Sequence, residues 1–290
     1  MIAPRDWLVV VFPVMLVVLG VPQRATDQPL PAVAAPRHSP PTSRASRITH
    51  PFSRYQEGED LRAYVERSNS RLDDPQTMYY VSQALEECRT WGAMPDDDEL
   101  PNVTVISHVD WRQWVRSGAA ATLSAPCRGF GGRVIDSGRI FTLLQEAARM
   151  GEPHARARML LFRDIAAPKS DVMEEIPILL ATGDPQIVRD VGAFLAKGEV
   201  SLRYGSSLVD ASIAVIAWEL AACDLGYPCG PMSRIVLAQC AFRGYCDAYS
   251  YDDAIARDED PERMAQAQHL RQGLVRALRR QDWTWLGFAN

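Results

Sequence analysis

The spacing of apolar residues is that of α-helices over most of this 290-residue protein. From about residue 55 onwards, apolar side chains recur three and four positions apart, which places them on one face of a helix. Strand-type alternation is scarce, and Val103–Ile106 is the one credible strand. The clearest helical stripes are Leu61–Val65, Tyr79–Cys88, Ile140–Ala147, Met159–Phe162, Ile176–Leu180, Val188–Leu195, Ile213–Leu220, Ile235–Gln239 and Leu270–Leu278. The pattern predicts an all-α fold.

Two connections between these predicted helices share one design. Gly151–Pro153 and Gly183–Pro185 each combine a glycine that ends one helix, an acidic residue that caps the next, and a proline suited to its first position. The two copies lie 32 residues apart, which is the length of a two-helix repeat unit. A third junction, Gly226–Pro231, is a variant with two prolines. We expect helical hairpins stacked as an α-solenoid; a compact irregular helical domain is the alternative.

The N-terminus carries an export signal. Arg5 precedes the apolar run Trp7–Val21, whose 15 residues are long for a signal-peptide core and short for a comfortable membrane span. We therefore expect residues 1–21 to be a cleaved signal peptide or a retained signal anchor, with the rest of the protein outside the cytoplasm. Residues 22–52 are rich in proline and poor in apolar side chains, which predicts a disordered linker. The predicted helical domain covers residues 53–290.

Composition agrees with a folded domain that disulfides reinforce but do not replace. The sequence is 47% hydrophobic, which is enough for a substantial core, and its formal net charge is −5. It lacks the excess of basic residues that neutralises phosphates, so we expect no nucleic-acid partner. We expect contact with a membrane only through the N-terminal segment.

Four of the six cysteines form two pairs with the same spacing. Cys223 and Cys229, and likewise Cys240 and Cys246, are six residues apart near predicted helix ends. In an antiparallel hairpin, Cys240 would lie roughly 13 Å along the helix axis from Cys223, whereas bonded cysteines have Cα atoms less than about 7 Å apart. We therefore predict two local disulfides, Cys223–Cys229 and Cys240–Cys246.

The remaining cysteines, Cys88 and Cys127, are predicted to form a third disulfide between distant parts of the sequence. Closely spaced thiols downstream of an export signal indicate disulfides in an oxidising compartment. Zinc binding is the alternative, but five residues between the cysteines of a pair is not the usual zinc-ligand spacing.

Two stretches resemble known helical proteins. The sequence LLQEAARMGEPHARARMLL (residues 143–161) resembles the helix–turn–helix of Sel1-like and tetratricopeptide repeat proteins. The sequence AWELAACDLGYPCGPMSRIVLAQCAFRGYC (residues 217–246) resembles a module of uncharacterised exported bacterial helical proteins with a C-terminal CxxxxxC…CxxxxxC pattern. The second predicted repeat departs from the consensus, with Ile187 and Val188 where the repeat has a small alanine. The resemblance implies a helical-repeat scaffold for protein interaction and brings no catalytic residues with it.

No constellation of residues indicates a catalytic, cofactor-binding or metal-binding site. The sequence has no serine-hydrolase elbow, no phosphate-binding Walker loop and no HExxH pair. Glu86 and Glu87 diverge by about 100° on a helix, so only one of them is expected to face a cleft. Glu219, between Trp218 and Leu220, is a candidate general acid if buried, but we expect it to face solvent.

Other polar residues are expected to have structural roles. His154 lies in the first turn of a predicted helix and is interpreted as a surface or hydrogen-bonded residue. Gly205–Ser207 precedes a predicted helix and is interpreted as its N-cap.

Aromatic residues supply a further indication of binding. Trp111 and Trp114 are three residues apart on a predicted helix, and Trp283 and Trp285 flank a threonine near the end of the sequence. Exposed tryptophans are favoured anchors in protein interfaces. These four are the possible binding aromatics, although core packing is the commoner role of tryptophan.

The sequence therefore predicts an exported or membrane-tethered helical scaffold that binds another protein of the cell envelope. The domain would lie outside the cytoplasm, in the periplasm or anchored to the inner membrane. Two alternatives are an immunity or inhibitor protein against a secreted toxin and a cell-wall glycan hydrolase with Glu219 as its general acid.

Overall fold

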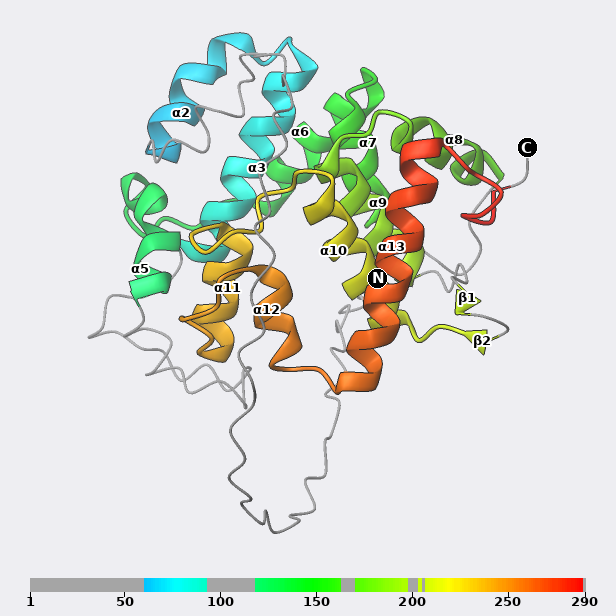
Figure 1. Ribbon diagram of the computed structural model, residues 1–290. Coiled ribbons are helices and arrows are strands. Elements are labelled where there is room, and N and C mark those ends of the chain that lie inside the picture. The colour runs from blue at the N-terminus through cyan, green and yellow to red at the C-terminus, as the bar shows by residue number, and fades with distance from the viewer. Residues whose placement is uncertain (1–59, 93–117, 163–169, 198–202, 205–206, 289–290) are drawn as a thin grey trace, which may run out of the picture. The chain divides into compact units, whose positions relative to one another are not determined.

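The computed structural model of the protein describes residues 60–92, 118–162, 170–197, 203–204 and 207–288. Eleven α-helices, two 3₁₀ helices and one pair of two-residue strands follow one another within these ranges (Figure 1). The helices that precede the strands are α2 (Leu61–Ser68), η1 (Asn69–Arg71), α3 (Pro75–Trp91), α5 (Gly118–Ser124), η2 (Ala125–Phe130), α6 (Ser137–Arg149), α7 (Pro153–Leu160), α8 (Ser170–Leu180) and α9 (Pro185–Lys197). The helices that follow are α10 (Ala211–Asp224), α11 (Arg234–Arg243), α12 (Tyr251–Ala256) and α13 (Pro261–Arg280). The predicted all-α class is confirmed.

Several sequence predictions fall on residues that lie outside the described ranges. They are the signal or anchor at residues 1–21, the linker at 22–52, the strand at Val103–Ile106, and the tryptophans Trp111 and Trp114.

The two repeated turns form as their residue types predict. Gly151 and Gly183 end α6 and α8 with φ angles of 93° and 67°, values that glycine adopts without strain. Glu152 then caps α7 by accepting the backbone N–H of Ala155 at 2.9 Å. Asp184 caps α9 in the same way, accepting the N–H of Gln186 at 2.8 Å. Each proline occupies the first position of its helix, where the lack of an N–H costs no hydrogen bond.

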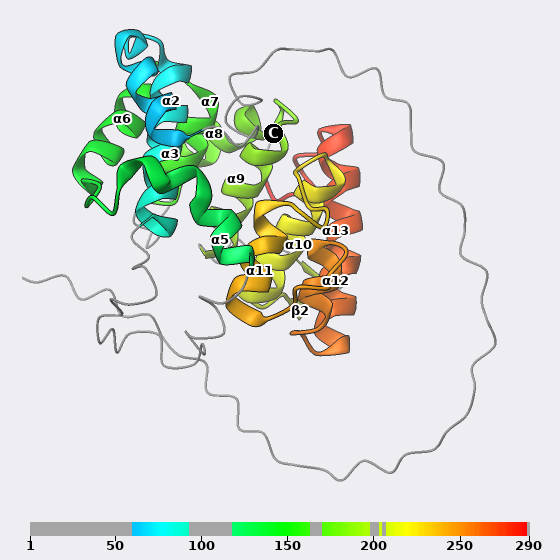
Figure 2. The same cartoon turned by 90° about the vertical axis from the view of Figure 1, so that its left-hand side faces the viewer.

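The helices from α6 to α10 pack side by side, as expected for stacked hairpins, although α7 packs mainly on α9 and not on α8, the next helix in the sequence. α6 packs on α7, α7 on α9, α8 on α9, and α9 on α10. The stack then becomes irregular, because α10 is covered by the long helix α13, whereas α11 returns to pack against α5 (Figure 2). α2 and η2 pack on α3, and α3 packs on α6. All of these elements belong to one compact unit that spans residues 48–290.

α10 is the most apolar of these helices and lies between α9 and α13 (Figures 1 and 2). Its Trp218 is only 1% exposed. The indole ring packs directly on Gly192 of α9, where an added Cβ would lie 2.5 Å from the Trp218 side chain. Glycine is therefore required at this position, since a larger residue would push the two helices apart.

The cysteines are joined in the three pairs that the sequence predicts. The Cα–Cα distances are 5.2 Å for Cys88–Cys127, 5.6 Å for Cys223–Cys229 and 4.3 Å for Cys240–Cys246. The first bond is buried and ties α3 to η2. Each of the other two closes a short loop at the C-terminal end of a helix, α10 and α11 respectively.

One local interpretation of the sequence is wrong. The N-cap of α10 is Asp210, whose carboxylate accepts the N–H of Ser212 at 2.8 Å, and not a residue of Gly205–Ser207. Ser207 lies instead in the two-residue strand β2 (Ser207–Leu208), which pairs antiparallel with β1 (Arg203–Tyr204). Within the described ranges, the length and hydropathy needed to span a bilayer do not occur together in any helix.

Candidate functional site

A cleft of about 620 Å³ opens where α3, α5, α7, α9 and α11 approach one another. We call it the central cleft. α3 contributes its face from Tyr79 to Trp91, and α5 with η2 contributes Thr122, Leu123 and Pro126. The remaining walls are Arg158 of α7, Gln186 and Arg189 of α9, Tyr227 and Pro228 after α10, and residues 232–235, 237 and 238 around the start of α11. The volume lies within the range of about 300–1,000 Å³ that is usual for ligand sites.

The central cleft lies between separate apolar clusters. One is built on α2, α3 and α6, a second on α8, α9, α10 and α13, and a small third on α5 and α11. The helices that line the cleft belong to all three clusters. Ligand sites are commonly found at such boundaries, because the side chains there are not consumed in packing one core.

Arg158 ties two walls of the cleft together. Its Nη2 donates to Glu86 Oε1 of α3 at 2.8 Å, and its Nη1 donates to Asp190 Oδ1 of α9 at 3.3 Å. Asp190 is only 2% exposed, and its other oxygen accepts from Gln186 Nε2 at 3.1 Å. Burial raises the pKa of Asp190, and Arg158 and Arg189 oppose that effect. Arg158 thus links α3, α7 and α9 in one charged layer.

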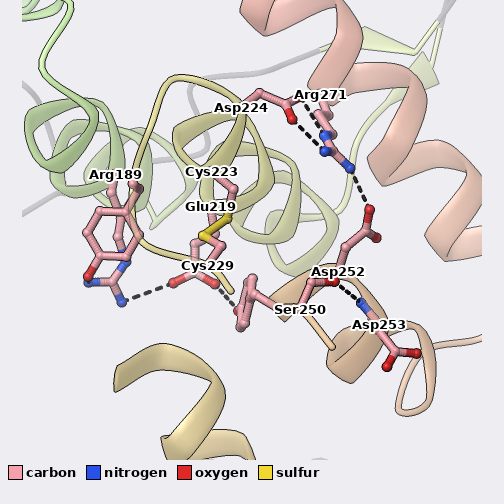
Figure 3. Close-up of a disulfide and its surroundings, with 11 residues drawn as sticks. Arg189, Glu219, Cys223, Asp224, Cys229, Ser250, Asp252, Asp253 and Arg271 are labelled. Carbon is pink, nitrogen blue, oxygen red and sulfur yellow. Dashed lines mark hydrogen bonds and ion pairs between the residues drawn. A yellow bond between two sulfur atoms is a disulfide. The ribbon is translucent and has the colours of Figure 1, made fainter. Parts of the chain in front are cut away.

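Arg189 forms a second charged contact, which Figure 3 shows beside the Cys223–Cys229 disulfide. Its Nη2 lies 3.2 Å from Glu219 Oε1, and its guanidinium lies over the ring of Tyr227, 5.2 Å from the centroid. The hydroxyl of Tyr251 donates to the other oxygen of Glu219. Arg189 is therefore held by α10 and by the loop after α10, and Tyr251 of α12 fixes the carboxylate that it contacts.

The expectation that Glu219 faces solvent is wrong. Its side chain is 16% exposed, and both carboxylate oxygens have partners, Arg189 and Tyr251. The sequence pattern could not show this, because the partners lie 30 and 32 residues away. Glu219 is absent from the lining of the central cleft. It is connected to the cleft only through its ion pair with the lining residue Arg189.

The expectation that only one of Glu86 and Glu87 faces a cleft is also wrong. Both line the central cleft. Glu86 pairs with Arg158 of α7, whereas Glu87 pairs with Arg234 of α11 on another wall. The angle of about 100° between neighbouring helical residues is compatible with both contacts, because α3 lies between two walls of the same cleft.

The N-terminus of α11 also lines the central cleft. Ser233 is the N-cap residue, yet its hydroxyl forms no cap hydrogen bond, and its Oγ is buried without a partner among the described residues. Ser233, Arg234 and Ile235 all contribute to the lining. The first turn of a helix leaves backbone N–H groups without intrahelical partners and carries a partial positive charge.

All three disulfides lie next to walls of the central cleft. Pro126, which lines it, precedes Cys127, and Tyr227 and Pro228 lie inside the loop that Cys223–Cys229 closes. Leu237 and Ala238 lie on α11 just before Cys240. The Cys229 carbonyl also accepts the N–H of Tyr251 at 3.0 Å, which fixes this loop against α12. Cys88–Cys127 and Cys223–Cys229 thus restrain two walls covalently, whereas the loop that Cys240–Cys246 closes follows the lining part of α11.

His154 connects the two repeated turns next to α3. Its Nδ1 lies 2.9 Å from Glu152 Oε1 and its Nε2 lies 3.2 Å from Asp184 Oδ2, and the ring stacks on Tyr79, with centroids 5.2 Å apart. Burial alone would lower the pKa of His154, but hydrogen bonds to Asp184 and Glu152 outweigh it and raise the pKa to about 9. The charged ring therefore joins the N-caps of α7 and α9, a structural role of the kind expected from the sequence.

The predicted binding aromatics that the structure describes are not in the central cleft. Trp283 is half-buried and packs against the larger apolar cluster, and Trp285 is 44% exposed, with its ring against Gly273 of α13. The aromatic residues that do line the cleft are Tyr79, Tyr80, Trp91 and Tyr227. Trp91 also packs on Phe242 of α11, with ring centroids 5.4 Å apart. The sequence feature that could have pointed to Trp91 is its position three residues after Cys88, on the apolar stripe of α3.

The described residues contain no group of three or more His, Cys, Asp or Glu side chains suited to hold a metal ion. No family model matches the sequence. No curated protein matches it, and no solved structure matches its fold.

Proposed function

We propose that this protein is an exported binding protein of the cell envelope and that another envelope protein docks in the central cleft. The observation that carries the proposal is the position of the disulfides, two of which restrain walls of the one cleft while the third closes the far end of α11. Disulfides persist in oxidising compartments outside the cytoplasm. The apolar run at residues 7–21 supports the same location, as a cleaved signal or as an anchor in the inner membrane.

Restraint of the walls favours binding because a preorganised site loses less conformational entropy when a partner docks. A disulfide that closes a short loop removes about 2 kcal/mol of conformational entropy from the unfolded state. The Cys223–Cys229 loop presents Tyr227 and Pro228 to the cleft, so this bond holds contact residues and not merely a helix end. Tyrosine, tryptophan and arginine on the other walls are the residue types most often found as interface anchors.

The chemistry of the cleft supports binding better than glycan hydrolysis. A general acid needs a carboxyl group that holds a proton and can reach the substrate. Glu219 has an arginine on one oxygen and a tyrosine hydroxyl on the other, and it does not line the cleft. Asp190 is buried beneath Arg158. The hydrolase alternative therefore has less support than docking of a protein segment.

The test uses a bulky substitution at the mouth of the cleft. Thr122 of α5 lines the cleft, is exposed, and donates its hydroxyl to the carbonyl four residues earlier. Thr142 of α6 is also exposed and has the same type of bond, but it is not among the lining residues. Thr122→Trp is expected to abolish capture of the partner from solubilised envelopes, and Thr142→Trp is expected to leave it intact.

Quantitative mass spectrometry of the captured proteins provides the readout, with the full-length oxidised protein as bait. The proposal requires at least one envelope protein that the wild type and Thr142→Trp retain and Thr122→Trp loses. Equal capture by all three baits would remove the cleft from the function. Cell fractionation with a measurement of the mature N-terminal mass tests the location, and finding the protein with free thiols in the cytosol would contradict export.

A further inference from the structure

The hydrogen-bonding groups that line the central cleft are unbalanced toward donors. The carboxylates have partners inside the protein: Glu86 accepts from Arg158 and, at 3.4 Å, from Gln83, and Glu87 pairs with Arg234. Asp190, which is buried behind the lining, has a partner on each oxygen. A guanidinium, in contrast, carries five N–H donors and no acceptor. Arg158 and Arg189 each use one N–H of both terminal nitrogens, so a second N–H remains on each of these nitrogens, while the Nε of each is buried without a partner among the described residues.

The N-terminal turn of α11 adds donors to the same cleft. Its backbone N–H groups are not capped by Ser233, whose own Oγ is buried without a partner among the described residues. Arg234 lies at the first position of this helix, with its side chain 41% exposed and next to Glu87. A hydroxyl, a helix N-terminus and arginines from α7, α9 and α11 thus line one cavity.

We propose that the central cleft recognises a carboxylate of its partner, supplied by an aspartate or glutamate side chain or by the partner's C-terminal carboxyl group. This inference rests on the proposed function and specifies the chemistry of the docked segment. Arginine forms forked hydrogen bonds that match the geometry of a carboxylate, and a helix N-terminus favours a negative group. The internal carboxylates hold Arg158 and Arg189 in place before the partner arrives, so little side-chain freedom is lost on docking.

Apolar residues that line the same cleft specify what accompanies the carboxylate. Leu123, Pro126, Ile235 and Leu237 provide an apolar surface, and Met232 stands strongly exposed at the start of α11. Methionine adapts its shape to varied apolar partners. The docked segment is therefore an acidic peptide with apolar side chains, and not a uniformly charged one.

Fluorescence anisotropy with three synthetic nonapeptides tests this inference on the oxidised full-length protein. The peptides share the same leucine and phenylalanine positions, are acetylated and amidated, and carry glutamate, glutamine or lysine at the variable positions. We expect the glutamate peptide to bind about tenfold or more tightly than the glutamine peptide, because hydrogen bonds to charged groups are the stronger ones. We expect the lysine peptide to bind least. A glutamine peptide with a free C-terminus distinguishes a terminal carboxylate from the carboxylates of acidic residues.

Matched variants locate the binding. Arg189→Lys keeps a positive charge next to Glu219 but loses the forked geometry, and Glu87→Gln/Arg234→Gln removes one pair without a change of net charge. Each is expected to weaken binding of the glutamate peptide several-fold, by about the strength of one charged hydrogen bond. Arg276→Gln on the exposed face of α13, outside the cleft lining, is the control and should leave the affinity unchanged.

The outcomes separate this inference from the proposed function. Equal affinity for the glutamate and glutamine peptides, preference for the lysine peptide, or a dissociation constant above about 1 mM for every carboxylate peptide would overturn carboxylate recognition. Docking in the cleft would still stand in those cases if Thr122→Trp abolishes partner capture. If Thr122→Trp has no effect on capture, the proposed function itself fails.

Discussion

The layer formed by α9, α10 and α13 and the charged boundary around the central cleft are stabilised in opposite ways. In the layer, α10 is apolar on almost every side, and Trp218 packs on the bare backbone of Gly192. At the boundary, α3, α7 and α9 are joined through Arg158, Glu86 and Asp190. The difference shows that one helical domain can combine an apolar core with a polar boundary, at which charged side chains of separate helices pair and line a cleft.

The largest expected effect comes from truncating the apolar layer. Trp218→Ala should lower the free energy of unfolding by about 4 kcal/mol, because Gly192 offers no side chain to fill the space that the indole leaves. Urea denaturation followed by circular dichroism measures the loss. Trp285→Ala, at a half-exposed position beside α13, is the control and should cost about 1 kcal/mol. Equal losses for the two variants would mean that α10 is not the centre of the core.

A smaller loss of stability is expected when the arginine that joins α3, α7 and α9 at the charged boundary is removed. Arg158→Met leaves Asp190 buried without its cation, and should lower the free energy of unfolding by about 2 kcal/mol, since the arginine is still partly solvated. The double variant Arg158→Met/Asp190→Asn removes both charges and should recover at least half of that loss. The same denaturation experiment measures both. A double variant as unstable as the single one would show that the boundary is held by packing and not by charge.

The smallest effect is a pH dependence at the junction of the two repeated turns. The pKa of His154 is raised to about 9 in the folded protein, compared with about 6.5 in the unfolded state. A raised pKa means that the folded state binds the proton more tightly, so the stabilisation is fully present below about pH 6.5. It is lost as the pH rises through 9.

The measurement is the free energy of unfolding at several pH values between about 6 and 10, for the wild type and for His154→Gln. The wild type should lose stability across this window, and the variant should have a much flatter profile. A variant with the same slope as the wild type would assign the pH dependence to other groups and leave the contacts with Glu152 and Asp184 as neutral hydrogen bonds.

Features that depend on neighbours in the sequence were predictable. The two glycine–acid–proline turns form the caps that their residue types indicate, because the carboxylate and the N–H groups it accepts are two or three residues apart. The local disulfides Cys223–Cys229 and Cys240–Cys246 followed from loop length and helix rise in the same way. The pairing of Cys88 with Cys127 followed only because no other cysteine remained.

The cleft was not predictable, and Glu219 and Glu86 show why. Glu219 faces Arg189 and Tyr251, which are 30 and 32 residues away, and Arg158 meets Glu86 across 72 residues. Helical periodicity predicts which face of a helix is apolar. It does not predict which other helix will pack against the polar face. The tryptophans chosen from the sequence therefore lie away from the cleft or outside the described residues, whereas Trp91, which lines the cleft, was not among them.

By itself, the sequence determined the helical class, the turns, the caps and the short disulfide loops, since each of these results from interactions within one or two helical turns. Only the tertiary structure decided that arginines of α7, α9 and α11 meet glutamates of α3 and α10, and that all three disulfides border one cavity. The physical reason is that ion pairs and cavities depend on the distance between helices in space. That distance is set when separate apolar stripes pack together, and no short segment of the sequence specifies it.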